Sequence, residues 1–109
     1  MTAVADLASF LNARWDEAER ESELFHEPDC PTHLLNGHHG SCACLYPAQI
    51  RERTASHRRI LHDCLQRISH EQASSCWPME SILAFQAMKA LALPFELHPA
   101  FQDTWHTWP

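Results

Sequence analysis

The side chains best suited to chemistry gather in one segment, residues 26–44, which reads HEPDCPTHLLNGHHGSCAC. These 19 residues hold three of the five cysteines and four of the nine histidines. Thiolate sulfur and imidazole nitrogen are ligands that Zn²⁺ prefers, and a structural site holds the ion with four of them. The segment therefore predicts a zinc ion in a structural role.

The spacing suggests two local pairs of ligands. Cys42 and Cys44 are separated by one residue, and in an extended segment such side chains point to the same side. The second pair is either His26 with Cys30 or Cys30 with His33. Both choices complete a tetrahedral set of four, so the spacing alone leaves the fourth ligand open.

A tight turn is predicted within this segment at Asn36-Gly37, a dipeptide that favours chain reversal. A strict two-residue turn there sets Cys30 opposite Ala43, on the wrong face for the other two cysteines. The predicted metal site therefore requires a bulge or a longer loop.

Two segments with helical periodicity flank the predicted loop. Apolar residues recur at three- and four-residue steps through residues 3–25 and again through 47–70, which predicts two helices that face each other. The first stripe contains Val4, Leu7, Leu11, Trp15 and Ala18. The second seam contains Ile50, Thr54, His57, Leu61, Cys64 and Ile68, with Ile60 and Leu65 beside it. We interpret Cys64 as a core residue and His57 as an interface histidine.

A third helix is predicted at residues 78–93, opened by Pro78 and stopped by Pro94. Its apolar residues surround the helix nearly completely, and such a helix is usually central and buried. The tail that follows has room for one short turn, and Trp105 is expected to pack, as is Trp15 in the first helix. The predicted fold is all-α: a small bundle of three main helices, a metal-clasped loop between the first two, and a short aromatic C-terminal segment.

The length of 109 residues predicts a single domain spanning 1–109. The N-terminal residues carry no basic leader, so we expect no signal peptide, and no apolar run is long enough for a membrane span. We therefore expect a cytoplasmic protein, in which five cysteines act as metal ligands or buried thiols rather than as disulfides.

The net charge of −6 is unevenly distributed. Residues 1–29 hold eight acidic side chains against Arg14 and Arg20, whereas five of the eight basic residues lie between Arg51 and Arg67. An acidic first helix beside a basic second helix explains this pattern without any external partner. The remaining alternative is an acidic surface that binds a basic partner.

Three segments resemble a family of small uncharacterised actinobacterial and actinophage proteins. They are FLNARWDEAER, YPAQIRERTASHRRIL, which is similar to the family's YPARVL…KRRIL, and LALPFELHPAFQDTW, which is similar to LALPYADHPDY…W. One branch of that family has an H-x3-C…C-x-C pattern before YPA. The resemblance implies that the ligands are His26, Cys30, Cys42 and Cys44. The chain departs from the family at CWPM and at SILAFQAMKA.

These observations favour a non-catalytic helical zinc module that acts through contacts with a partner protein and has a phage or mobile-element association. One alternative is a nucleic-acid-associated regulatory factor that uses Arg51, Arg53, Arg58 and Arg59, although the net acidity disfavours phosphate binding. A second alternative is a metal-dependent hydrolase, which requires an open coordination position. Four protein ligands leave none open, and we assign no catalytic residue.

Overall fold

The computed structural model describes residues 2–25, 44–72 and 79–106. These residues form three α-helices, α1 (Thr2–Ser22), α3 (Leu45–Gln72) and α4 (Met79–Ala92). They also form three short 3₁₀ helices, η1 (Glu23–Phe25), η2 (Leu93–Phe95) and η3 (Asp103–Trp105). The described part of the chain contains no strand, so the predicted all-helical class is confirmed for those residues.

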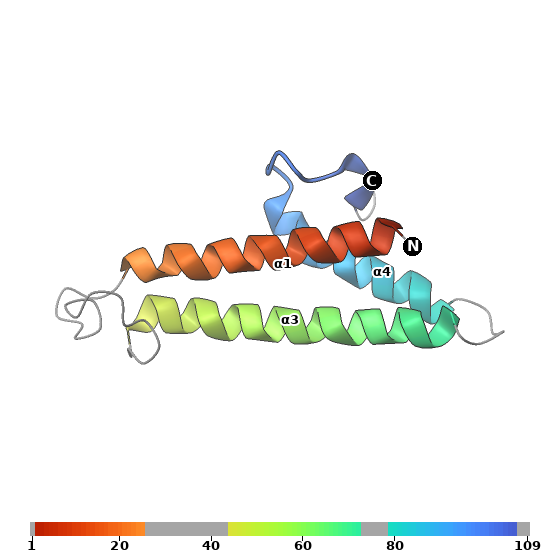
Figure 1. The fold of residues 1–109 in the computed structure, drawn as a ribbon, viewed down its shortest axis with the longest axis horizontal. Helices are drawn as coiled ribbons and strands as arrows, with labels where there is room; N and C mark the ends of the chain where they lie inside the picture. Colours follow the sequence, from red (N-terminus) through yellow and green to blue (C-terminus); the bar gives the residue numbers. More distant parts are fainter. Residues whose placement is uncertain (1, 26–43, 73–78, 107–109) are drawn as a thin grey trace.

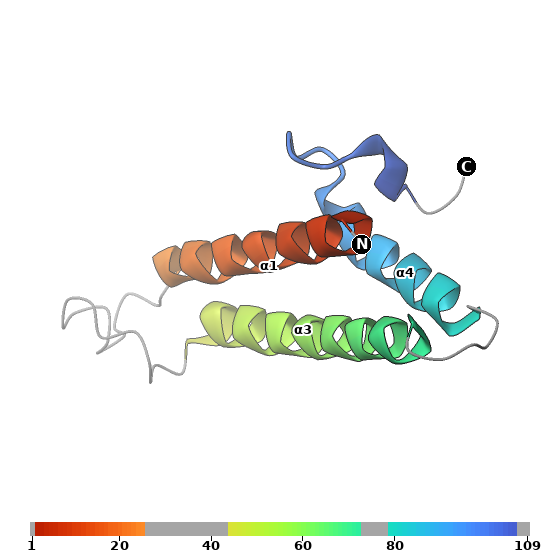
Figure 2. The ribbon, with the colours of Figure 1, turned by 45° about the vertical axis from the view of Figure 1, so that its right-hand side comes forward.

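The two longest helices, α1 and α3, run side by side in opposite directions (Figures 1 and 2). Their facing side chains are those of the predicted seams. Buried residues include Leu7, Leu11 and Trp15 from α1, and Ile50, Thr54, Leu61, Cys64 and Ile68 from α3. Ile60, expected beside the seam, is instead exposed. The helical periodicity of the sequence therefore identified this interface correctly, apart from one flanking residue.

The helix boundaries differ from the predicted ones by about one turn or less. The α-helical geometry of the first helix ends at Ser22 and continues as η1, and α3 begins at Leu45, two residues before Pro47. Proline is tolerated there because the first-turn N–H groups have no partner within the helix. The N–H of Ala48 donates to the carbonyl oxygen of Cys44 at 3.1 Å, which closes the first turn of α3.

α4 packs against α3 and α1 through one face only. Its buried residues are Ala84, Met88 and Ala92. On its opposite face, Met79 is 51% exposed, Ile82 49% and Leu83 58%. The expectation that residues 79–93 lie at the centre is therefore wrong. Apolar residues that surround a helix do not specify which of its faces meets the core. In addition, α4 has 14 residues and α3 has 28, so α4 covers only part of the α1–α3 pair.

The C-terminal segment turns back over the first half of α1 (Figure 1). The side chain of Phe10 contacts its rings, with centroid distances of 6.3 Å to Phe95, 6.0 Å to Phe101 and 4.9 Å to Trp105. Trp105 and Trp15 are both buried, as predicted. The predicted short turn in the tail corresponds to η3.

None of the helices in the described ranges combines the length and the apolar character that crossing a membrane would require.

Candidate functional site

The predicted metal ligands His26, Cys30 and Cys42 lie outside the described residues, as does the alternative ligand His33. Cys44 is described and is buried directly before α3. Within residues 2–25, 44–72 and 79–106, no three histidine, cysteine, aspartate or glutamate side chains are grouped so that they could hold a metal ion. The metal-clasped loop therefore stays a prediction.

The two helix ends that flank the predicted site lie together. The rings of Phe25, at the end of η1, and Tyr46, at the start of α3, are 5.1 Å apart between centroids. One turn further along α3, Arg51 Nη1 lies 3.5 Å from Glu23 Oε1. His26 follows Phe25 in the chain and Cys44 precedes Tyr46 by two residues. The fold therefore brings Phe25, the last described residue before the predicted ligand segment, close to the start of α3, which follows that segment.

Ion pairs join the acidic α1 to the basic α3. Arg58 lies 2.5 Å from both Asp16 and Glu19, and Arg51 pairs with Glu23. The expectation that acidic side chains of the first helix pair with basic side chains of the second helix is confirmed for Arg51 and Arg58. Two of the four arginines in the nucleic-acid alternative are thus already neutralised within the chain, which lowers the positive potential available to phosphates.

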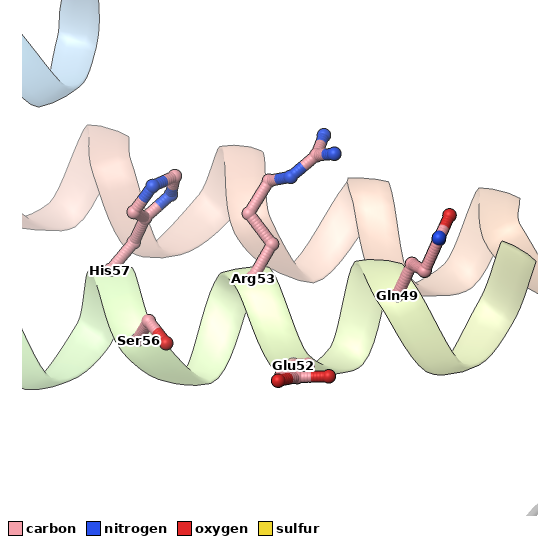
Figure 3. Close-up of a pocket in the computed structure, with 5 residues that line it drawn as sticks. All are labelled: Gln49, Glu52, Arg53, Ser56 and His57. Atoms are coloured by element: carbon pink, nitrogen blue, oxygen red, sulfur yellow. The ribbon is translucent and has the colours of Figure 1, made fainter.

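Arg53 lines a shallow depression of about 400 Å³ together with Gln49, Glu52, Ser56 and His57 (Figure 3). All five residues belong to α3, and Gln49, Arg53 and His57 project toward α1. The depression contains one arginine and one carboxylate, so the formal charges of these two side chains cancel. It is also open to solvent, and it offers neither a concentrated phosphate-binding surface nor the water-excluded site that hydrolysis requires.

His57 and Cys64 occupy structural positions, as predicted. The His57 ring packs against Trp15 with 5.9 Å between centroids. Cys64 is buried in the core. Burial raises the pKa of the Cys64 thiol, and Asp63 raises it further against the opposing effect of Arg67. Cys64 therefore remains a thiol at neutral pH, which disfavours a role as nucleophile or ligand.

The side chain of Glu71 caps the start of α4, a contact the sequence reasoning missed. The N–H groups of Glu80 and Ser81 donate to its two carboxylate oxygens at 2.9 and 2.8 Å. Nearby, Arg67 contacts Asp63 at 2.9 Å and Glu80 at 3.1 Å. Trp77, the residue before Pro78, has no side-chain oxygen that could cap a helix starting at Pro78, so an acceptor from elsewhere in the chain, such as an acidic side chain, was to be expected.

A second contact that sequence reasoning missed involves Arg14 on α1. Its guanidinium lies over the Phe10 ring at 5.0 Å from the centroid and also contacts the ring of His98. Arg14 Nε lies 3.0 Å from Glu17 Oε1. These interactions hold the C-terminal segment against α1. We assign this cluster a structural role because its members are engaged with one another.

A model of the family described as "Family of unknown function (DUF6221)" matches residues 4–107. Comparisons with curated proteins and with solved structures gave no match. The family match extends over α1 from residue 4 onward, over α3 and α4, and over the described C-terminal segment. The chain therefore belongs to DUF6221, a family of unknown function.

Proposed function

We propose that this protein is a non-catalytic helical module in which a structural zinc ion joins the ends of α1 and α3, and that it acts by binding another protein. The ligands in this proposal are His26, Cys30, Cys42 and Cys44. The observation that supports it best is the meeting of the two helix ends, where Phe25 contacts Tyr46 at 5.1 Å between centroids. A segment whose two ends are held together can close around one ion with little additional loss of chain entropy.

The proposed zinc supplies order to a segment with few large apolar residues of its own. Structural zinc sites contribute directly to folding free energy because the ligands are not assembled in the unfolded chain. A coordination shell of four protein ligands has no open position for substrate or water. The ion would therefore set the geometry of the α1–α3 junction rather than perform hydrolysis.

The proposed setting is a reducing cytoplasm, where thiols persist as metal ligands, and the proposed association is with a phage or mobile element. In that setting the protein would serve as an inhibitor or as an accessory protein of the virion. Nucleic-acid binding is the less supported alternative, since Arg51 and Arg58 pair with carboxylates of the chain's own N-terminal segment. Of the four arginines named in this alternative, Arg53 and Arg59 are exposed and would be left to contact phosphate groups.

Elemental analysis of protein purified without chelator tests the metal directly. We expect one zinc per chain, lost in Cys42→Ser and retained in Cys64→Ser, because Cys64 lies in the core away from the helix ends. Folded protein without stoichiometric metal would contradict the proposal. Zinc lost on His33→Ala but retained on His26→Ala would keep the site and change its fourth ligand.

Zinc affinity should also decrease as the pH falls, because zinc binds thiolate and neutral imidazole, and at lower pH the thiol and the imidazolium must first lose their protons. Removal of zinc should lower the free energy of unfolding by several kcal/mol. Helix content should survive in part, since α1 and α3 retain their apolar seam. Circular dichroism with and without chelator measures the helix content, and denaturant titration with and without chelator measures the free energy of unfolding.

A further inference from the structure

We draw no further inference here: the strongest candidate, the apolar outward face of α4 formed by Met79, Ile82 and Leu83, carries none, because nothing among the described residues shows what covers it.

Discussion

The two halves of α1 are held by different chemistry. The first half packs under the aromatic C-terminal segment, where Phe10 contacts Phe95, Phe101 and Trp105. The second half packs against α3, and it and the adjoining η1 are tied to α3 by the ion pairs of Arg58 and Arg51. One helix thus passes from an aromatic cluster at its start to an interface in which a buried seam that includes Trp15 is flanked by partly exposed ion pairs.

This difference follows from how far α4 and the tail extend along the α1–α3 pair. Where they cover α1, aromatic rings are removed from water, and that burial is the larger contribution to stability. Where α4 and the tail do not cover α1, the partly exposed ion pairs contribute little to stability because solvent and salt screen them. We therefore expect the free energy of local opening to be greater at the start of α1 than at its end.

The largest expected effect comes from removing the centre of the aromatic cluster. Phe10→Ala should lower the free energy of unfolding by about 3–5 kcal/mol, because it leaves a cavity among the rings. Phe25→Ala makes the same change beyond the other end of α1, where the ring is exposed, and should cost less than about 1 kcal/mol. Equal losses in denaturant titrations would show that the two halves of α1 are not energetically distinct.

A smaller effect is expected from the ion pairs of the charged half. Arg58→Gln should cost about 1 kcal/mol, since it removes two partly exposed ion pairs, and high salt should shrink the difference. Arg59→Gln is the matched control, because the neighbouring Arg59 is exposed and pairs with no described residue. Thermal unfolding at low and high salt measures both variants. A loss for Arg58→Gln that is independent of salt would argue against screened electrostatics.

The smallest expected effect concerns the cap between α3 and α4, and it depends on pH. Burial by itself would raise the pKa of the Glu71 carboxyl, but the N–H groups of Ser81 and Glu80, together with His70, lower it below its ordinary value of 4.5. A lowered pKa means that the ionised cap stabilises the fold above pH 4.5, and that this contribution is lost as pH falls through the folded-state pKa.

Glu71→Gln tests the cap because it keeps the shape of the side chain and removes its charge. The variant should be less stable than the unmodified chain at neutral pH, and the difference should shrink in acid. Denaturant titrations across that pH range measure this difference. A gap that stays constant from neutral to acidic pH would mean that ionised Glu71 does not stabilise the start of α4.

Much of the α1–α3 pair was predictable from sequence because its determinants are local. Steps of three and four residues define one apolar face on each helix, as at Leu7, Leu11 and Trp15. The separation of acidic residues on the first helix from arginines on the second also predicted that ion pairs join the two helices, and the pair of Arg58 with Asp16 is one of them. The spacing of cysteines and histidines in residues 26–44 still predicts a zinc site, but most of that segment lies outside the described residues.

The sequence by itself determined where the helices lie and which faces of α1 and α3 meet, because each of these helices has a single apolar stripe. Only the tertiary structure decided which side of α4 is buried, since its apolar residues surround the helix and periodicity favours no face. Tertiary structure also decided that Glu71 caps α4 and that Phe10 anchors the tail. These contacts join residues far apart in sequence or across a loop, and no local pattern encodes the distance between them.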